Sequence, residues 1–587
     1  MDVTIVIKIT YFDSFRRSRN LKRNCHVTIL GAVLRSDVRA IRFSVLRGPF
    51  AVTQLSRSLV LGCSVLALAA CGPDDIASPG TGGNITINNP APTPSPTPTP
   101  TGPAVVTPAA GCPTISDPQG LTDSGTITGP EGTWRVCTLP RVIRASITLP
   151  RVPGLLYELD GRVDVGCDGG FTVPSAAAPR TTSTVACPVA QPMTSDTNVN
   201  LTIEPGVILF GGTGQSWLAV NRGNRITAVG TPTHPIVFTS RDNILGLNTD
   251  SSQGQWGGVV LMGRARTTDC TTGTVAGNTC ERQTEGAPDP ARFGGLDDSY
   301  DAGRMSYVQI RYSGFVLGAN VELQALTAEA VGSGTRLDHI QSHNSSDDGA
   351  EFFGGRFGLK YYIATGADDD SLDVDTGARV DVQHALLIQR PGLGDALFEI
   401  DSNSNEADTP RTRLRIANFA AIQPNTSANN EANDQASALF RGNSDTTLVN
   451  GLIVSPNNEC IRMNGSGGAN AATLTARSVA LTCNGAKYIG SGSYTAANVA
   501  SAFGSGANNN NDALTSTLTN LFVNGANETG VPAFDAATLS PFFDATSYIG
   551  AVPNASASWF RQWTCNSAYA NFGNDNTGHC TAVPVFS

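Results

Sequence analysis

The sequence predicts an all-β protein that folds as a right-handed parallel β-helix, a solenoid closed by N- and C-terminal caps. An acidic pattern occurs three times, in Asp347–Gly355, Asp369–Gly377 and Asp395–Ser402. Self-similarity at a period of twenty-odd residues is typical of a solenoid. Within each copy apolar and acidic residues alternate, as in a strand with one face in the core. The 587 residues include 62 Gly and 34 Pro with only 15% charged residues, which suits a turn-rich β protein.

The spacing of the three copies predicts which side chains lie on neighbouring turns. One face of each copy is apolar and should enter the core: Ala350 and Phe352, Leu372 and Val374, Phe398 and Ile400. The other face is acidic and should point outward: Glu351, Asp373, Asp375, Glu399 and Asp401. Extending the period places Glu329 next to Glu351 on the preceding turn, and places Arg441 and then Arg462 on the turns that follow Glu399. We therefore expect a column of outward carboxylates with two arginines further along it.

The first 70 residues have the features of an upstream extension followed by a bacterial secretory signal. The apolar run Leu59–Ala70 is short of the ~20 residues that span a bilayer, and it ends in Leu68-Ala69-Ala70-Cys71. This ending resembles the lipobox of bacterial lipoproteins, in which the cysteine is lipidated and becomes the mature N-terminus. We expect Cys71 to anchor the protein to the outer membrane, on its cell-surface or periplasmic face.

The remaining chain divides into four predicted parts. Residues 71–109 are rich in Pro and Thr and should form an extended, disordered tether. Residues 110–190 should form an N-terminal β cap, and residues 191–490 the parallel β-helix, from which an excursion, Arg264–Arg304, should project as a loop. Residues 491–587 should cover the open end of the solenoid, since Trp559 and Trp563 supply bulky apolar groups there.

Ten cysteines of the exported part form consecutive close pairs. They are Cys112 and Cys137, Cys167 and Cys187, Cys270 and Cys280, Cys460 and Cys483, and Cys565 and Cys580. An even number in an exported protein indicates disulfides, and we expect pairing between these neighbours.

Several motifs together resemble a known family. Gln255–Gly263, Val331–Thr335, Asp347–Gly355 and the ending Tyr548–Trp563 look like those of uncharacterised bacterial surface lipoproteins, common in proteobacteria, whose body is a pectin-lyase-like right-handed β-helix. The resemblance covers roughly residues 195–565. It implies the fold and the surface location, and it brings no established activity with it. Polysaccharide lyases and hydrolases share this architecture, but that is an analogy of fold only.

The acidic face is the candidate site, and calcium is its candidate ligand. Clustered carboxylates suit Ca²⁺, which accepts six to eight oxygens in an irregular cage. The candidate ligands are Asp347, Asp348, Glu351, Asp369, Asp370, Asp373, Asp375, Glu399 and Asp401. Two alternatives remain open: a solvated acidic surface with turn residues, and a catalytic role. We expect His339, His343 and His384 to be structural, and Phe353, Tyr361 and Tyr362 to serve packing.

The charge distribution also limits the possible partners. The whole chain carries −10 and residues 1–70 carry 11 Lys+Arg against 3 Asp+Glu, so the residues after 70 carry −18. This argues against nucleic acid and anionic lipid as ligands. We expect a lipid-anchored, non-catalytic protein that binds a cation, a glycan or an outer-membrane protein. The alternative is a Ca²⁺-dependent polysaccharide lyase or a glycoside hydrolase, with Arg441 and Arg462 near the acids.

Overall fold

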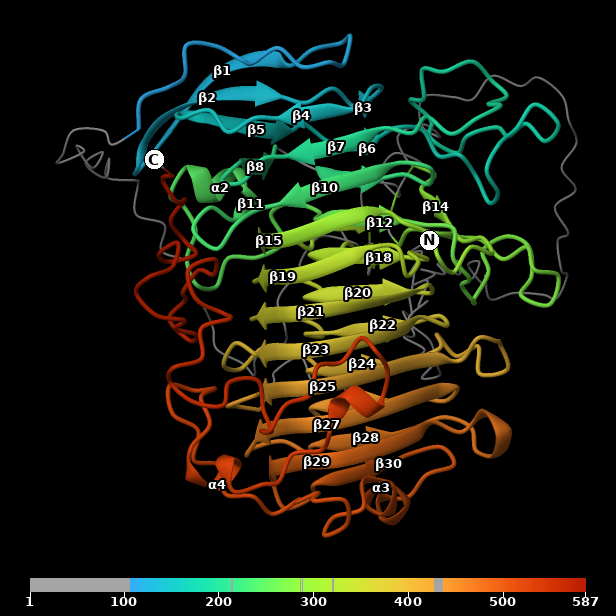
Figure 1. Cartoon of the computed structure of the whole chain (residues 1–587), viewed down its shortest axis with the longest axis vertical. Coiled ribbons are helices and arrows are strands. Elements are labelled where there is room, and N and C mark those ends of the chain that lie inside the picture. The colour runs from blue at the N-terminus through green and yellow to red at the C-terminus, as the bar shows by residue number, and fades with distance from the viewer. Residues whose placement is uncertain are drawn as a thin grey trace, which may run out of the picture. The chain divides into compact units, whose positions relative to one another are not determined.

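Two long sheets of mostly parallel strands run side by side along one axis (Figure 1). The computed structural model describes residues 106–586, except 213–214, 286, 288, 319–320 and 427–435. The expected signal peptide, the predicted lipidation site Cys71 and most of the tether lie outside these residues. Successive turns of the chain add strands alternately to the two sheets. The prediction of a parallel β-helix is therefore confirmed.

The larger sheet has 15 strands among the described residues. They are β1 (Thr122–Gly129), β2 (Gly132–Thr138), β4 (Ile147–Leu149), β5 (Leu155–Leu159), β7 (Asn200–Ile203), β8 (Ile208–Gly211), β10 (Arg225–Val229), β11 (Ile236–Ser240), β15 (Gly303–Arg311), β19 (Arg336–His343), β21 (Arg356–Thr365), β23 (Arg379–Ile388), β25 (Thr412–Ile422), β27 (Ser444–Ser455) and β29 (Thr473–Cys483).

The smaller sheet has 11 strands in the same part of the chain. They are β3 (Val142–Ile143), β6 (Arg162–Val165), β9 (Trp217–Val220), β12 (Val259–Met262), β18 (Leu326–Glu329), β20 (Ala350–Phe353), β22 (Asp373–Asp375), β24 (Phe398–Ile400), β26 (Ala438–Phe440), β28 (Ile461–Met463) and β30 (Tyr488–Gly490).

Two short hairpins and several short helices lie outside the two long sheets. The hairpins are β13 (Arg282–Gln283) with β14 (Arg292–Phe293), and β16 (Val316–Gly318) with β17 (Val321–Glu322). The helices are α2 (Arg241–Ile244), α3 (Ala496–Phe503), α4 (Ala526–Thr529), η1 (Gly468–Asn470) and η2 (Ala536–Thr538). No helix in the described residues is long and apolar enough to cross a membrane.

From β15 onward each strand of the larger sheet bends at one fixed position. β10 pairs with the first part of β15 and β11 with its second part, so two separate strands have become one. The bend falls at residues with φ between 50° and 61°: Tyr307, His339, Tyr361, His384, Asn418, Asn450 and Ser478. Left-handed backbone is uncommon for residues other than glycine. Its recurrence at the same place on successive turns makes it the corner of the solenoid.

The N-terminal segment is already part of the β-helix. Within residues 110–190, β2 pairs in parallel with β5, and β5 continues to β8. In the smaller sheet β6 pairs in parallel with β3 on one side and with β9 on the other. The β-helix therefore starts before residue 191, and among the described strands of the two long sheets only β1 runs antiparallel to its neighbour. Val106 pairs with Gly132, so the last residues of the predicted tether are folded as well.

The C-terminal region does more than cover the open end. Helix α3 packs against the last strands of both sheets, as a cap should. Residues 515–586, which we call the strap, instead run back along the larger sheet to its first turns (Figure 1). Trp563 lies near Tyr307 and His339, and Phe586 lies near His234. The prediction that all of 491–587 is an end cap is therefore wrong.

Side-chain amides of the larger sheet hold the backbone of the strap. Gln341 Nε2 donates to the Cys565 carbonyl at 3.0 Å, and Cys565 N donates back to Gln341 Oε1 at 2.8 Å. Asn450 exchanges the same two bonds with Phe534, at 2.8 and 2.7 Å. The outer face of this sheet is also apolar, with Ile363, Leu386 and Ile422 buried under the strap. These contacts explain why an outward face carries apolar residues.

The five predicted disulfides are all present. They join Cys112 to Cys137, Cys167 to Cys187, Cys270 to Cys280, Cys460 to Cys483, and Cys565 to Cys580. Each closes a loop of 10 to 25 residues, so each holds a local excursion or two neighbouring turns.

Candidate cation-binding site

The three central acidic strands stack as the sequence predicts. In the smaller sheet Glu351 pairs with Asp373, and Asp373 pairs with Glu399. Two residues further along the same strands, Phe353 pairs with Asp375. The apolar residues between them, Phe352, Val374 and Ile400, enter the core. We call the nine candidate ligands named above the acidic ladder.

The register is different on both sides of the ladder. Glu329 pairs with Phe353, and the neighbour of Glu351 on the preceding turn is Thr327. Glu399 pairs with Leu439, which in turn pairs with Arg462. The predicted positions of Glu329 and Arg441 are therefore wrong by two residues. The reason is that apolar residues set the register: Ile400 stacks on Phe440 in the core, and a connection of variable length absorbs the difference.

Arg441 nevertheless reaches the acids, from just beyond the end of β26. Its Nη1 lies 3.0 Å from Glu399 Oε1 and 3.1 Å from Asp401 Oδ2. One guanidinium thus bridges two carboxylates at the end of the ladder.

The ladder is buried, which argues against the alternative of a solvated acidic surface. Glu351, Asp373, Asp375, Glu399 and Asp401 are all at most 4% exposed. Asp348 and Asp370 are buried as well, and only Asp347 and Asp369 are partly exposed.

The excursion packs against this side of the body, at the ends of the acidic strands, instead of projecting as a loop. Thr284 Oγ1 donates to Glu329 Oε2 at 2.7 Å, and the Arg282 guanidinium lies 5.1 Å from the centre of the Phe353 ring. Further along, Asn405 Nδ2 donates to Asp269 Oδ1 at 2.6 Å. The excursion therefore contacts the body from β18 to the turn after β24.

Three groups of carboxylates are close enough to share an ion. They are Asp347 with Asp348 and Asp369, Asp348 with Glu351 and Asp373, and Asp369 with Asp370 and Asp395; within each group the oxygens lie within 4.8 Å of one another. Ca²⁺ binds oxygens at ~2.3–2.6 Å, so two oxygens on one ion lie within about 5 Å. The donor set and its spacing could therefore hold a metal ion. Asp395, which the predicted ligand set omitted, completes the third group.

Burial and like charges change the protonation of the ladder. Burial raises the pKa of Asp370 well above its usual value, and the charges of Glu399 and Asp369 raise it further. Burial and the charges of Asp401 and Asp373 do the same for Asp375. Beside the ladder, burial raises the pKa of Glu329 to about 8. At neutral pH the Glu329 carboxyl group therefore holds its proton.

Backbone N–H groups already stabilise part of the ladder. Asp370 N donates to Asp348 Oδ1, and Ala396 N donates to Asp370 Oδ1, each at 2.9 Å. Asp348 and Asp370 thus also hold neighbouring turns together. This is the structural alternative to metal binding, and it leaves other oxygens of these groups within the three clusters.

The histidines and aromatic residues of this region serve packing, as predicted. The rings of Tyr307, His339, Tyr361 and His384 stack at 4.2 to 4.8 Å between centroids along the corner of the solenoid. His343 is fully buried, and its Nδ1 lies 2.9 Å from Thr365 Oγ1.

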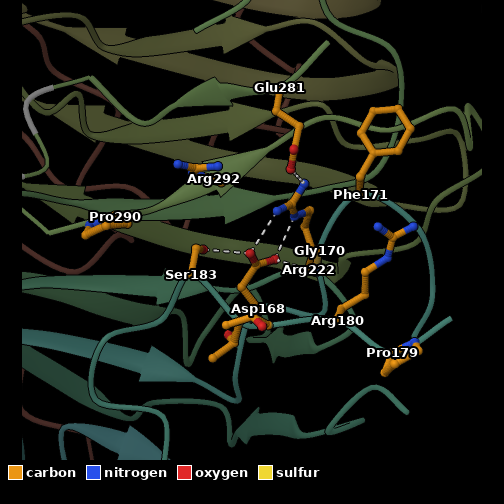
Figure 2. Close-up of a pocket in the computed structure, with 12 residues that line it drawn as sticks. Asp168, Gly170, Phe171, Pro179, Arg180, Ser183, Arg222, Glu281, Pro290 and Arg292 are labelled. Carbon is orange, nitrogen blue, oxygen red and sulfur yellow. Dashed lines mark hydrogen bonds and ion pairs between the residues drawn. The ribbon is translucent and has the colours of Figure 1, made fainter. Parts of the chain in front are cut away.

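A second cluster of buried charges, not recognised in the sequence, lies beside the first turns of the β-helix. Arg222 stands in the short turn between β9 and β10, and its side chain is 1% exposed. Its Nε and Nη2 donate to Asp168 at 2.6 and 2.8 Å, and its Nη1 donates to Glu281 at 2.6 Å (Figure 2). Arg222 therefore joins the loop after β6 to the excursion after β12.

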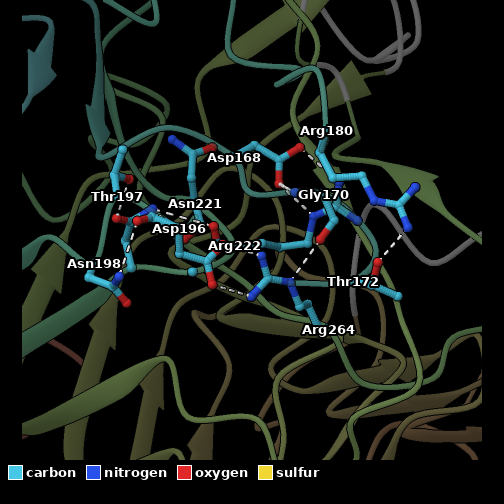
Figure 3. A network of polar contacts seen from close by, with 12 residues as sticks. Asp168, Gly170, Thr172, Arg180, Asp196, Thr197, Asn198, Asn221, Arg222 and Arg264 are labelled. Atoms are coloured by element: carbon cyan, nitrogen blue, oxygen red, sulfur yellow. Dashed lines mark hydrogen bonds and ion pairs between the residues drawn. The ribbon is translucent and has the colours of Figure 1, made fainter. Parts of the chain in front are cut away.

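A similar pair lies next to it. Arg264 donates two hydrogen bonds to Asp196, at 2.8 and 2.6 Å, and a third to the Gly170 carbonyl at 2.8 Å (Figure 3). We call the residues Asp168, Asp196, Arg222, Arg264 and Glu281 the arginine network.

Pairing reverses the effect of burial on the acid in this network. Burial alone would raise the pKa of Asp168, but the charge and hydrogen bonds of Arg222 outweigh it and hold that pKa below its usual value. The one hint in the sequence is that Asp168 and Glu281 each follow a disulfide cysteine directly. The partner of Asp168 is 54 residues away in the chain, so periodicity could not identify it.

Comparison with known proteins agrees with this architecture. The family described as "Pectate-lyase like beta helix domain" matches residues 186–533, more than half of the chain. No curated protein and no solved structure matches significantly. The chain belongs to the pectate-lyase-like β-helix domain family.

Proposed function

We propose that this member of the pectate-lyase-like β-helix family is a non-catalytic polysaccharide-binding protein whose body is stabilised by calcium in the acidic ladder. The observation that carries the proposal is the set of three carboxylate clusters with oxygens within 4.8 Å, in which most of the groups are buried. The family relationship is compatible with a polysaccharide-related function.

Electrostatics favours an ion in the ladder. Two like charges ~4 Å apart cost about 1 kcal/mol in water and several times more at the lower effective dielectric of a protein. Protonation can relieve this repulsion, as the raised pKa values of Asp370 and Asp375 indicate, and so can a divalent cation. When bound, calcium would neutralise charge and cross-link the turns that carry β20, β22 and β24.

The test is thermal unfolding of the soluble body, residues 106–587, with Ca²⁺, Mg²⁺ or EDTA, followed by glycan-array binding under the same conditions. We expect Ca²⁺ to raise Tm more than Mg²⁺ does, because Mg²⁺ requires a stricter octahedral geometry. We also expect binding of at least one acidic or neutral polysaccharide. A Tm indifferent to calcium and EDTA would overturn the calcium part, and a blank array would overturn the glycan part.

Catalysis by a lyase mechanism is the second candidate, and Arg441 is the observation that raises it. A lyase requires a base next to the cation to remove a proton beside a carboxylate. Arg441 is at the ladder, but it is engaged by Glu399 and Asp401 at 3.0 and 3.1 Å. The test is to incubate the protein with polyuronates and calcium and to follow the ultraviolet absorbance of the unsaturated uronate products that a lyase would form. Product formation that disappears in Arg441→Lys would replace the non-catalytic proposal.

The location at the outer membrane, through lipid on Cys71, is also a proposal. It is supported by the short apolar run before Leu68-Ala69-Ala70-Cys71. Inhibition of lipoprotein signal peptidase, or Cys71→Ala, should leave unprocessed precursor. Normal processing in both cases would overturn the assignment.

A further inference from the structure

A cavity of about 490 Å³ lies next to the arginine network, and Asp168, Arg222 and Glu281 of the network form part of its lining (Figure 2). One wall is the loop after β6, with Phe171, Arg180 and Ser183, and the other is the excursion, with Pro290 and Arg292. Its volume lies within the ~300–1,000 Å³ range of small-molecule sites. The cavity is separate from the acidic ladder, whose residues do not line it.

The lining carries more positive than negative charge. The charged residues of the lining are three arginines, Arg180, Arg222 and Arg292, and two acids, Asp168 and Glu281. This excess of positive charge contrasts with the net charge of −18 that the chain carries after residue 70. Arg222 is already neutralised, because it binds both of those acids. The positive charge that remains therefore belongs to Arg180 and Arg292.

Neither Arg180 nor Arg292 is neutralised within the described part of the chain. Arg180 donates from Nη2 to the Thr172 hydroxyl, and among the described residues no carboxylate forms an ion pair with either guanidinium. The Nε of Arg180 is buried and has no hydrogen-bond partner there. Figure 2 shows the two guanidinium groups on opposite sides of the Asp168–Arg222 pair.

The other lining groups suit the uncharged part of a small polar molecule. Phe171 is only partly buried and offers an apolar face at the cavity. Ser183 Oγ donates to Asp168 Oδ2 at 2.6 Å, so its lone pairs remain for a hydroxyl donor on a ligand. Thr182 adds a second hydroxyl.

Both walls are held in place before any ligand binds. The disulfide Cys167–Cys187 closes the loop that carries Phe171, Arg180 and Ser183, and the backbone of Arg180 pairs with Met193. On the other wall Cys280, next to Glu281, is bonded to Cys270. A preformed site loses less conformational entropy on binding.

We propose that this cavity binds a small organic molecule that carries a carboxylate, sulfate or phosphate group, with Arg180 and Arg292 supplying positive charge from either side of the Asp168–Arg222 pair and Phe171 contacting the carbon skeleton. Guanidinium groups bind each of these oxyanions through paired hydrogen bonds. The site is independent of calcium in the ladder and of the proposed polysaccharide function.

The test is isothermal titration of the soluble body with four probes of one skeleton type. They are galacturonate, glucose 6-sulfate, glucose 6-phosphate and neutral galactose, each titrated at low and high salt in the presence of EDTA. We expect at least one anionic probe to bind at least tenfold more tightly than galactose and to weaken as salt rises. The preferred anion identifies which oxyanion the site takes. Equal affinity for charged and neutral probes, or no binding by any anion, would overturn the proposal.

Matched variants assign the binding to this cavity. Arg180→Gln and Arg292→Gln should each weaken the preferred anion about tenfold or more, because hydrogen bonds between charged groups are the strong ones. Arg304→Gln, at an arginine that is 50% exposed and lies outside the cavity, should leave affinity unchanged. Arg180→Lys with Arg292→Lys keeps the charge and should retain part of the binding. Unchanged affinity in both Gln variants, with Tm preserved, would contradict the assignment.

Discussion

The acidic ladder and the arginine network both bury charge, but they do so in opposite ways. In the ladder, carboxylates stack on carboxylates along β20, β22 and β24. In the network, each buried acid meets a guanidinium, as Asp168 meets Arg222 at 2.6 Å. The pKa values follow the difference, since that of Asp375 is raised and that of Asp168 is lowered.

The difference shows that burial by itself does not fix the protonation of a carboxyl group. Burial disfavours the charged form in both places, and the neighbouring charge then decides the outcome. The network is complete without a ligand. The ladder, by contrast, brings carboxylate oxygens of neighbouring turns within 4.8 Å of one another, and this is why it is the candidate metal site.

Breaking the network should produce the largest loss of stability. Arg222→Met leaves Asp168 and Glu281 without their guanidinium partner, and Asp168 stays buried. Removing one partner of a buried ion pair typically costs ~3–5 kcal/mol, because the other charge is left uncompensated. Denaturant unfolding of the purified body should show a loss of this size. A loss below about 1 kcal/mol would mean that the network does not stabilise the fold.

Removing charge from the ladder should have a smaller effect, which depends on calcium. Asp373→Asn with Asp375→Asn should abolish the rise in Tm, because two candidate ligands are lost. In wild type that rise corresponds to ~2.7 kcal/mol at a calcium concentration 100 times Kd. Without metal the same changes should be neutral or stabilising, because like-charge repulsion is removed. The exposed pair Asp123→Asn with Asp575→Asn, at side chains 46% and 50% exposed, is the matched control and should keep the calcium response.

In the metal-free protein, the free energy of unfolding should change with pH in opposite directions for Glu329, beside the ladder, and Asp168, in the network. The folded pKa of Glu329 is raised to about 8, so between about pH 4.3 and pH 8 the folded state binds a proton that the unfolded state lacks. Stability should therefore fall as pH rises through this window, by up to ~1.4 kcal/mol per pH unit for one group.

Glu329→Gln should flatten that slope in denaturant unfolding with EDTA. Asp168 acts with the opposite sign: its lowered pKa contributes stability that is fully present above the unfolded value of about 3.9 and is lost as pH falls through the folded value. A slope that persists unchanged in Glu329→Gln would assign it to another group.

An exposed ion pair should produce the smallest effect and completes the comparison. Arg225 Nε lies 3.3 Å from Asp301 Oδ2, with side chains 59% and 40% exposed. Such pairs contribute ~0–1 kcal/mol, because water solvates both groups. Arg225→Gln should therefore change the free energy of unfolding by less than about 1 kcal/mol, in contrast to Arg222→Met three positions earlier.

The ladder also shows which strand pairings the sequence period can predict and which it cannot. Alternation of apolar and acidic residues correctly predicted that Glu351, Asp373 and Glu399 lie on consecutive strands. It failed at Glu329 and Arg441, where the connections between strands change in length. Register is fixed by apolar residues that stack in the core, and a charged residue after the strand is free to reach back, as Arg441 does.

The solenoid, its acidic strands and the local disulfides could all be predicted from the sequence, because each depends on residues within about one turn of one another. The burial of the acidic face became evident only in the tertiary structure, as did the contacts of the excursion with strands far along the chain. The tertiary structure also decided the path of the strap, where Arg311 Nη1 donates to the Cys580 carbonyl across 269 residues. Contacts of such separation leave no period in the sequence, because they depend on side-chain complementarity between surfaces that exist only after the turns have stacked.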